Sequence, residues 1–494
     1  MSNFHILNFG CRATQADGAA IEREMLASGL LRTDETSASV VVLNSCTVTA
    51  AADADVRAAV RRIHRNNPLA KILVTGCYAQ RAPQELAALP GVAWVVGNSH
   101  KSQVAGIAAS AALSAGAPVS APPHSQTDHN ANEADEPGNI SALISLDQIA
   151  AAEEIGSVNS AAEFISGDIF AHTEVLAAPV FEGDATASGF TRTRANLKVQ
   201  DGCNNRCSFC IIPFVRGNSR SLSTERVIAE AEQLVRAGFQ EIVLSGINLG
   251  RWGRDFERHA SSGRNDRFVN LLRYLLNRTA IAKLRISSVE PMDWSDELIE
   301  LVAQEPRIAK HAHLPLQSGS DRILRQMHRK YRPWHYEEKV TKIRAAMPDA
   351  AVGADVMVGF PGESDELFRE TYDFIARLPF TYLHVFSFSP RPGTPAAMLP
   401  DQVPVQCARQ RNRLLRDLIA QKNAAFRRGF VGRTLEAIIL SRSNSPSQPG
   451  AANVAEALTS NFIKLTLDGD RAPNQWITSQ VTALTEAGLH AHLA

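Results

Sequence analysis

The chain has 494 residues, 45% of them hydrophobic and 21% charged, a composition ordinary for a globular protein of about three domains. Its 51 basic and 51 acidic side chains give a formal net charge of zero, and only seven residues are cysteine. No apolar run approaches a membrane span, the first residues lack the pattern of a secretion signal, and a disulfide-stapled fold would have more cysteines. We therefore expect a cytoplasmic protein with no membrane partner.

The first hundred residues alternate between predicted strands and predicted helices. Three apolar runs each end in a cysteine, at Cys11 in HILNFGC, Cys46 in VVVLNSC and Cys77 in KILVTGC, and helix-forming segments span 16–31 and 51–67. This alternation predicts a parallel sheet, and ligands gather beyond the carboxyl ends of such strands. Cysteines at strand ends are often only packed side chains. Because these three share one position, we expect the N-terminal cysteines to form a three-thiolate site.

The segment 102–190 differs in composition from the rest of the chain. It contains twelve acidic residues and no Lys or Arg, so the remainder, with 39 acidic and 51 basic residues, is basic. The segment is also rich in Ala, Ser and loop-forming residues and poor in aromatic residues, which predicts an acidic insertion or linker. The basic remainder is compatible with a polyanionic partner, although charge alone is a weak indication.

From about residue 191 the alternation of strands and helices resumes. The predicted strands are 196–202, 241–248, 283–290, 311–317, 351–360 and 382–390. Helical patterns between most of them predict an incomplete (β/α) barrel, whose site lies at the carboxyl ends of the strands. A long helix is predicted over 405–429, and short strands at 433–441, 462–469 and 476–484 then predict a small β-barrel-like module.

A cysteine triplet follows the first predicted barrel strand. The stretch DGCNNRCSFC places Cys203, Cys207 and Cys210, here called the central cysteines, within eight residues. A structural zinc ion normally takes four ligands, and no second pair of ligands lies close in the sequence. A [4Fe–4S] cluster held by only three thiolates leaves one iron open to a small molecule. The triplet therefore predicts a catalytic iron–sulfur site.

The spacing Cys-x3-Cys-x2-Cys, with Phe209 before the last cysteine, resembles that of the radical S-adenosylmethionine (SAM) enzymes. With NFGCR, NSCTVT, VTGCYAQ, RTRANLKVQDGCNNRCSFCIIP, LPLQSGS and VGFPGE, the chain is similar to the radical SAM methylthiotransferases, and most closely to the MtaB family. The resemblance covers about 1–101 and 191–494. It implies an α/β fold with a methylthiotransferase domain at 1–101, the acidic insertion at 102–190, a radical SAM domain at 191–428 and an RNA-binding TRAM domain at 429–494.

The resemblance also implies the chemistry and the partners. Two [4Fe–4S] clusters and SAM would be the cofactors: the central cysteines would hold the cluster that generates a radical from SAM, and the N-terminal cysteines the cluster that supplies sulfur. The implied reaction converts C2–H of N6-threonylcarbamoyladenosine, at position 37 of tRNA, into C–S–CH3. The implied partners are tRNA, a sulfur donor, and an electron donor such as flavodoxin or ferredoxin.

Five residues near predicted strand ends match positions that approach SAM in this family, and an ordinary role in starting a loop is the alternative for each. They are Ser245, Gly246, Ser288, Glu290 and Gln317. Thr14 departs from the resemblance, since members commonly have Asn there.

Further side chains have two interpretations each. Arg216 and Arg220 would suit phosphate or the SAM carboxylate, or would be solvated loop residues. His311 and His313 are two residues apart on a predicted strand, so they share one face of it. They would either bind a metal ion or be hydrogen-bonded within the protein. Cys407 is expected to be a packing residue.

Alternative functions remain open from the sequence. The chain could methylthiolate isopentenyladenosine-37 of tRNA or an aspartate of a ribosomal protein, or it could be a non-catalytic iron–sulfur protein that binds RNA. The two cysteine sets and the barrel pattern argue against the last alternative. We expect the RNA-binding surface on the arginines between Arg409 and Arg433 and on the β-rich tail.

Overall fold

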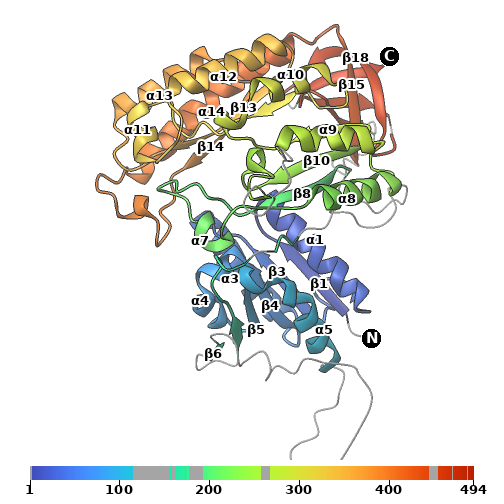
Figure 1. Cartoon of the computed structure of the whole chain (residues 1–494), viewed down its shortest axis with the longest axis vertical. Coiled ribbons are helices and arrows are strands. Elements are labelled where there is room, and N and C mark those ends of the chain that lie inside the picture. Colours follow the sequence, from blue (N-terminus) through green and yellow to red (C-terminus); the bar gives the residue numbers. More distant parts are fainter. Residues whose placement is uncertain are drawn as a thin grey trace, which may run out of the picture. The chain divides into compact units, whose positions relative to one another are not determined.

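The computed structural model describes residues 3–114, 155–157, 162–172, 174–176, 193–256, 267–443, 454–469, 471–486 and 488–494. Most of the predicted acidic insertion lies outside these residues. The chain forms two compact units (Figure 1). Unit 1 comprises Met1–Phe9, Ile21–Cys46 and Asp53–Ile169, and unit 2 comprises Gly10–Ala20, Thr47–Ala52 and Phe170–Ala494.

Unit 1 contains a seven-stranded sheet in the order β2-β1-β3-β4-β5-β7-β6. Its strands are β1 (Asn3–Asn8), β2 (Leu31–Arg32), β3 (Val40–Ser45), β4 (Lys71–Gly76), β5 (Val92–Gly97), β6 (Ile155–Ser157) and β7 (Glu163–Ile165). All neighbouring strands pair in parallel except β6, which is antiparallel to β7. The predicted parallel sheet is therefore confirmed, and the three strands that precede the N-terminal cysteines are neighbours in it.

The helices of this region are α1 (Arg12–Ala27), α2 (Ala50–Asn66), α3 (Cys77–Arg81), α4 (Pro83–Ala87), α5 (Val104–Ser114) and the 3-10 helix η1 (Asn98–Gln103). Strand β3 is buried along its whole length, and its residues Val41 and Leu43 belong to the same apolar cluster as one face of α2. Helix α5 and strands β6 and β7 fall within the range predicted as the insertion. The two strands have three residues each, too few for a recognisable alternation of polar and apolar residues.

Unit 2 contains the predicted incomplete barrel. Its strands are β8 (Ala195–Asp201), β9 (Arg220–Ser221), β10 (Glu241–Gly246), β11 (Lys283–Ile286), β12 (His311–His313), β13 (Ala351–Val358) and β14 (Tyr382–Ser387). They form the sheets β11-β10-β8-β9 and β12-β13-β14, and parallel bridges from Leu284 to Ile308 and from Ser288 to His313 link them. All six predicted barrel strands are present and parallel.

Helices alternate with these strands. They are α7 (Ile212–Arg216), α8 (Thr224–Arg236), α9 (Phe268–Arg278), α10 (Asp296–Gln304), α11 (Asp321–Gln326), α12 (Pro333–Ala346), α13 (Asp365–Arg377) and α14 (Val405–Arg428), with 3-10 helices η2 (Leu249–Arg251), η4 (Pro291–Asp293) and η5 (Pro395–Met398). Ser223, Ser295 and Ser364 cap the N-termini of α8, α10 and α13 by accepting hydrogen bonds from backbone amides.

The barrel strands have two chemically different faces. Alternate residues such as Leu197, Ile242, Leu284, Val352 and Val356 belong to the large apolar core that the helices cover. The residues between them are mostly polar, and their registers place them side by side across the sheet, as with Lys198 and Ser245, Glu241 and Lys283, and Asp355 and His384. The inner face of the barrel therefore offers polar groups to a ligand, whereas the outer face supplies the hydrophobic stability.

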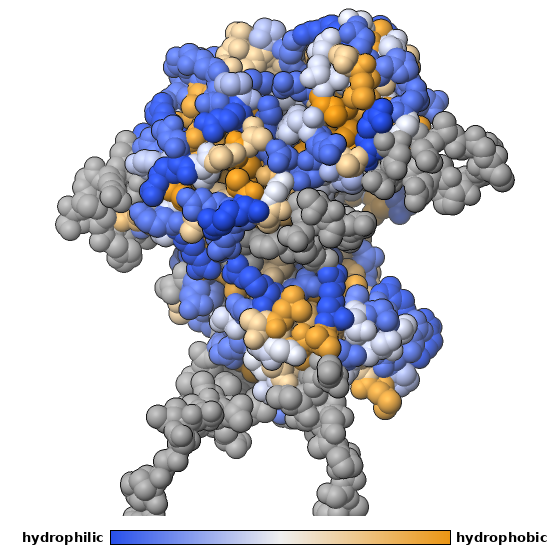
Figure 2. All heavy atoms as spheres, turned by 90° about the vertical axis from the view of Figure 1, so that its right-hand side faces the viewer, coloured by the Kyte–Doolittle hydropathy of each residue, from blue (hydrophilic) through white to orange (hydrophobic). Residues whose placement is uncertain are grey.

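The C-terminal tail of unit 2 forms a closed barrel in the order β15-β16-β17-β19-β18. Its strands are β15 (Thr434–Ser443), β16 (Val454–Thr459), β17 (Lys464–Asp468), β18 (Trp476–Leu484) and β19 (Leu489–Leu493). Three of the five were predicted. Strands β16 and β19 were missed because Glu456, His490 and His492 interrupt short apolar runs. Among the described helices, none is long and apolar enough to cross a membrane, and the face drawn in Figure 2 intersperses hydrophilic with hydrophobic residues.

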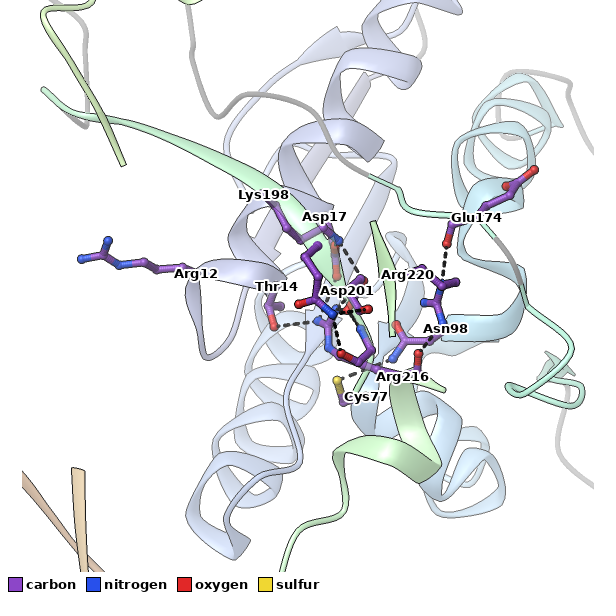
Figure 3. Close-up of polar contacts among 12 residues, drawn as sticks. Arg12, Thr14, Asp17, Cys77, Asn98, Glu174, Lys198, Asp201, Arg216 and Arg220 are labelled. Carbon is purple, nitrogen blue, oxygen red and sulfur yellow. Dashed lines mark hydrogen bonds and ion pairs between the residues drawn. The ribbon is translucent and has the colours of Figure 1, made fainter. Parts of the chain in front are cut away.

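Four buried charges hold the first turns of α1 against β8 and α7 within unit 2 (Figure 3). Lys198 forms ion pairs with Asp17 and, at 2.9 Å, with Asp201. Arg216 pairs with the same two carboxylates, at 2.9 Å in each case. Burial alone would raise the pKa of Asp201, but Arg216 and Lys198 hold it well below its usual value. We call these four residues the buried charge network.

Removal of one carboxylate from this network should destabilise unit 2 strongly. Asp17→Asn leaves two buried cations with one carboxylate, and breaking a buried ion pair in this way costs about 3 to 5 kcal/mol. Urea unfolding of the full chain measures the change. The control is Asp296→Asn, since Asp296 forms an exposed pair with Lys342 at 2.9 Å and should change the unfolding midpoint little. Equal effects of the two substitutions would contradict the structural role of the network.

Candidate functional site

The loop that carries the central cysteines begins where β8 ends. Gly202 has a φ of 68°, and a Cβ atom there would lie 1.9 Å from the carbonyl oxygen of Asn218, so only glycine fits. The Gly202 amide donates to Asp201 Oδ1 at 2.8 Å, and the Cys203 amide donates to the carbonyl oxygen of Gly217 at 3.0 Å. The buried charge network therefore sets the position of the residue immediately before this loop.

The three central thiols lie in a partly buried environment with several N–H donors. Cys203 Sγ accepts from Asn248 Nδ2 at 3.6 Å, and Cys207 Sγ accepts from Arg329 Nη1 at 3.2 Å. Burial, reinforced by the neighbouring thiols, raises the pKa of Cys203 and raises that of Cys210 to about 12. Three thiolates at this place thus need a positively charged partner to neutralise them.

The spacing of these sulfurs discriminates between possible partners. A tetrahedral zinc ion with Zn–S bonds of about 2.3 Å would require sulfurs about 3.8 Å apart. Among the described residues, the groups whose ligand atoms all lie within 4.8 Å of one another do not include the central cysteines. At least two of the three sulfurs therefore lie further apart than a zinc site requires, and the donor set fits the larger iron–sulfur cluster.

The predicted SAM contacts lie along the same barrel edge as the cysteine loop. Ser245 and Gly246 end β10, Ser288 and Glu290 follow β11, and Gln317 follows β12. Ser245 Oγ is buried without a hydrogen-bond partner among the described residues.

Asn248 Oδ1, also near this edge, is likewise buried and unpartnered among the residues that the structure describes. Gln317 adopts a φ of 64°, and its amide donates to the carbonyl oxygen of Asp355 at 2.8 Å. The structure thus brings the candidates to one edge and leaves buried polar atoms there for a ligand.

Arg329 is a residue of this edge that the sequence did not single out. Its guanidinium contacts Cys207 Sγ, forms an ion pair with Glu290 and donates to Tyr331 Oη at 3.2 Å. Burial alone would lower the pKa of Arg329, but Tyr331, Glu290 and Cys207 hold it well above its usual value. Three of the four residues in the segment RKYR are basic, and the sequence does not indicate which of them is buried.

Two of the N-terminal cysteines lie in unit 1, directly after neighbouring strands. Cys46 follows β3 and Cys77 follows β4, and both are buried. Gly76 has a φ of 101°, and a Cβ atom there would lie 2.4 Å from the carbonyl oxygen of Ser45, so glycine allows the two strand ends to approach closely. Asn98 Nδ2 donates to Cys77 Sγ at 3.5 Å.

The third N-terminal cysteine belongs to unit 2. Cys11 is exposed and lies three residues beyond the end of β1. Its Sγ atom contacts Thr14 Oγ1 at 3.6 Å, and Arg216 Nη2 donates to the same hydroxyl at 3.5 Å. Thr14, the residue that departs from the family pattern, therefore connects Cys11 to the buried charge network, as Figure 3 shows for Thr14 and Arg216.

The structure corrects the expectation for two arginines. Arg216 belongs to the buried charge network, and Arg220 is buried and donates to the carbonyl oxygens of Arg216 at 2.9 Å, Asn218 at 2.8 Å and Glu174 at 3.1 Å. Neither is a solvated loop residue: Arg216 pairs through Nη1 and Nη2 with Asp201 and Asp17, and Arg220 donates to backbone carbonyl oxygens. Loops that carry a strained glycine need such internal hydrogen bonds, which spacing in the sequence does not reveal.

The histidine pair has a protein partner. His311 Nε2 and His313 Nδ1 contact Tyr382 Oη at 2.6 and 2.9 Å, which confirms the interpretation as hydrogen-bonded strand histidines. Cys407 lies partly buried in α14.

Comparisons with known proteins agree with this geometry. The radical SAM superfamily matches residues 197–375, and the uncharacterized protein family UPF0004 matches residues 3–97. A threonylcarbamoyladenosine tRNA methylthiotransferase MtaB from Bacillus subtilis is 36% identical over 94% of this chain and 90% of its own length. The protein of the same description from Aquifex aeolicus is 34% identical, over 93% of this chain and 95% of its own length.

Among solved structures, the radical SAM methyltransferase TsrM from Kitasatospora setae matches with a TM-score of 0.48 and 15% identity, over 81% of this chain and 74% of that one. The two bacterial relatives each match more than nine-tenths of the chain. The chain therefore belongs to the MtaB family of radical SAM methylthiotransferases.

Proposed function

We propose that this enzyme adds a methylthio group to C2 of N6-threonylcarbamoyladenosine at position 37 of tRNA, in the cytoplasm. The observation that carries the proposal is the presence of two cysteine sets, each at the carboxyl ends of parallel strands, in a chain whose relatives are named for this reaction. The relatives named tRNA-2-methylthio-N(6)-dimethylallyladenosine synthase, such as that of Mycobacterium avium, are less similar, at 28% identity.

The proposal assigns one [4Fe–4S] cluster to the central cysteines and one to Cys11, Cys46 and Cys77. Strands β1, β3 and β4 are neighbours in the sheet. Cys11 follows the end of β1 by three residues, so it lies at most about 10 Å from that strand end. When bound, the two clusters and SAM supply the electron, the radical, the sulfur atom and the methyl group.

Side chains around the sulfurs donate hydrogen bonds to them. Asn248, Arg329 and Asn98 donate N–H groups to Cys203, Cys207 and Cys77 respectively. Such hydrogen bonds stabilise negative charge on sulfur and orient the ligands, so these three residues would tune the clusters. Ser245 Oγ and Asn248 Oδ1, which are buried without partners among the described residues, suit the amino and carboxylate groups of SAM.

The proposal places tRNA binding on a narrower set of arginines than the whole range from Arg409 to Arg433. Arg411 is buried and paired with Glu363 and Asp365 at 2.8 Å, and Arg433 pairs with Asp349. Arg409, Arg413 and Arg416 are exposed in α14 and spaced by four and three residues, which places them on one side of the helix. These three are available to tRNA phosphates.

The remaining parts of the proposal concern organisation and partners. The methylthiotransferase domain spans 1–101, the acidic insertion 102–190, the radical SAM domain 191–428 and the TRAM domain 429–494, the last supported by the closed five-stranded barrel. An electron donor of the flavodoxin or ferredoxin class and a separate sulfur donor would act with the enzyme, because cleavage of SAM consumes an electron and each product removes a sulfur atom.

Nucleoside analysis tests the proposed reaction. Cells that lack this protein should lose the 2-methylthio form of N6-threonylcarbamoyladenosine from their tRNA and accumulate the unthiolated form, and the gene on a plasmid should restore it. Mass spectrometry of digested tRNA measures both nucleosides. Loss of the 2-methylthio form of isopentenyladenosine instead would assign the enzyme to the other tRNA substrate.

Substitution of the N-terminal cysteines alone tests whether one site supplies sulfur and the other generates the radical. The variant Cys11→Ala, Cys46→Ala, Cys77→Ala should lose methylthiolation completely and still cleave SAM to 5′-deoxyadenosine when supplied with dithionite, because the central cysteines remain. Chromatography of the reaction measures both products, and Cys407→Ala is the matched control with no effect on either. Wild-type yield of methylthiolated tRNA from the triple variant would show that this set is not the sulfur site.

The arginines of α14 generate a prediction for salt dependence. Each lost phosphate contact should lower the slope of log affinity against log salt by about 0.7 to 0.9, because fewer counterions are released. Fluorescence anisotropy with labelled tRNA compares Arg409→Gln, Arg413→Gln, Arg416→Gln with a control triple on other helices, Arg226→Gln, Arg236→Gln, Arg273→Gln. If the slope is unchanged in the α14 variant, or is lowered equally in both variants, the assignment of tRNA binding to these three arginines is wrong.

A further inference from the structure

Arg12 lies among charged and aromatic residues of the barrel strands. Arg12 begins α1, and its carbonyl oxygen accepts from Asn196 Nδ2 at 3.0 Å, which fixes its backbone against β8. Among the described residues, its guanidinium has no hydrogen bond or ion pair, and in Figure 3 its side chain points away from the buried charge network. Its electrostatic neighbours are Arg194, Arg285, Tyr382 and Glu241, all within unit 2.

The charge around Arg12 is unbalanced. Glu241 is fully buried, and its carboxylate is occupied by Arg285 at 2.7 and 3.2 Å and by Arg194 at 3.3 Å. Glu241 is therefore the only carboxylate among the electrostatic neighbours named for Arg12, and it already pairs with the other two arginines. Arg12 is only partly buried, and a partly desolvated cation that lacks a counter-charge favours an anionic ligand that can reach it.

Strand β14, which contains the Arg12 neighbour Tyr382, has an exposed aromatic surface. Tyr382, His384 and Phe386 alternate along its inner face, with ring centroids 5.5 and 6.4 Å apart. The His384 side chain is 54% exposed and Phe386 is 47% exposed, whereas His313 on the same face of β12 is buried.

Asp355 holds the exposed ring of His384 in place. Its carboxylate accepts from His384 Nδ1 at 3.1 Å and from His313 Nε2 at 3.2 Å. These two hydrogen bonds lower the pKa of Asp355, against the raising effect of its burial, so the carboxylate stays charged at neutral pH. An aromatic surface that is both open and rigid is suited to stacking against a nucleic acid base.

We propose that Arg12 binds the carboxylate of the N6-threonylcarbamoyl group while the target base stacks on His384 and Phe386. This inference rests on the proposed function and identifies the part of the site that selects the substrate. The threonylcarbamoyl group carries a carboxylate that a guanidinium can hold with two hydrogen bonds, and an isopentenyl group has none. Asn196 Oδ1, buried beside Arg12 without a partner among the described residues, would accept from an N–H or hydroxyl of the same group.

Selectivity follows from the unpaired charge. A site built to pair a buried polar group rejects an analogue that lacks the partner, because the protein group is then left unsatisfied. Arg12 would therefore disfavour adenosine-37 that is unmodified or carries an apolar N6 substituent. A charged hydrogen bond of this kind corresponds to a discrimination of about tenfold to hundredfold.

Binding to two matched RNAs tests the proposal without depending on turnover. One anticodon stem–loop carries N6-threonylcarbamoyladenosine-37, and the other carries its neutral carboxamide. The wild-type chain should bind the first about tenfold to hundredfold more tightly, and Arg12→Gln should abolish that difference while leaving the affinity for the carboxamide unchanged. Arg12→Lys should retain part of the difference. Arg226→Gln, on the exposed side of α8, should retain all of it.

Other outcomes overturn the proposal in identifiable ways. Equal weakening of both RNAs by Arg12→Gln would show that Arg12 contacts the tRNA backbone, and no change would show that it contacts neither. Phe386→Ala should weaken both RNAs equally, and an unchanged affinity would remove the stacking surface.

A metal analysis distinguishes base stacking from metal binding by the residues around His384. The ligand atoms of His313, Asp355 and His384 lie within 4.8 Å of one another, and a stoichiometric metal other than iron that is lost in His384→Ala would show a metal site instead. If the carboxylate preference in binding persists but tRNA is not methylthiolated, the proposed function fails and the recognition site stands.

Discussion

The buried charge network is the interaction on which the arrangement of the site depends. Lys198 and Arg216 share the carboxylates of Asp17 and Asp201, at the start of α1 and the end of β8. From Asp201 a hydrogen bond leads to the amide of Gly202, the residue before Cys203.

A second connection leads from the same network to the other cysteine set. Arg216 donates to the hydroxyl of Thr14, which contacts Cys11 Sγ. One set of four charges therefore positions a cysteine from each set within unit 2. Replacement of a buried ion pair by apolar packing is often neutral or stabilising, so the contribution of these charges here is the position that they give to the neighbouring residues.

The polar inner face of the barrel explains how one sheet can serve both stability and chemistry. Helices bury the apolar outer face, whereas the inner face keeps buried atoms such as Ser245 Oγ and Asn196 Oδ1 that lack hydrogen-bond partners among the described residues. Unsatisfied buried polar atoms are rare in proteins and are expected where a ligand binds. Under the two proposals, the unpartnered atoms near the cysteine loop would serve SAM and those beside Arg12 would serve the nucleoside.

Much of this organisation could be predicted from the sequence because it rests on local patterns. The spacing of Cys203, Cys207 and Cys210, the strands that end at the N-terminal cysteines, and the six barrel strands are each contained in short stretches. The partners of Arg216 and the contact of Arg329 with Cys207 could not be predicted, because they join residues 199 and 122 positions apart. The short strands β6 and β7 were missed since three residues carry no periodicity.

The central claim is that the chain carries two iron–sulfur sites, each held by three cysteines. Iron quantification with Mössbauer spectroscopy on anaerobically reconstituted protein tests it most directly. Two four-iron clusters require about eight irons per chain in the wild type. Substitution of either the central or the N-terminal cysteines by alanine should leave about four, in a single cluster type. A wild-type chain with only about four irons, or full iron content after substitution of the central cysteines, would contradict the two-site account.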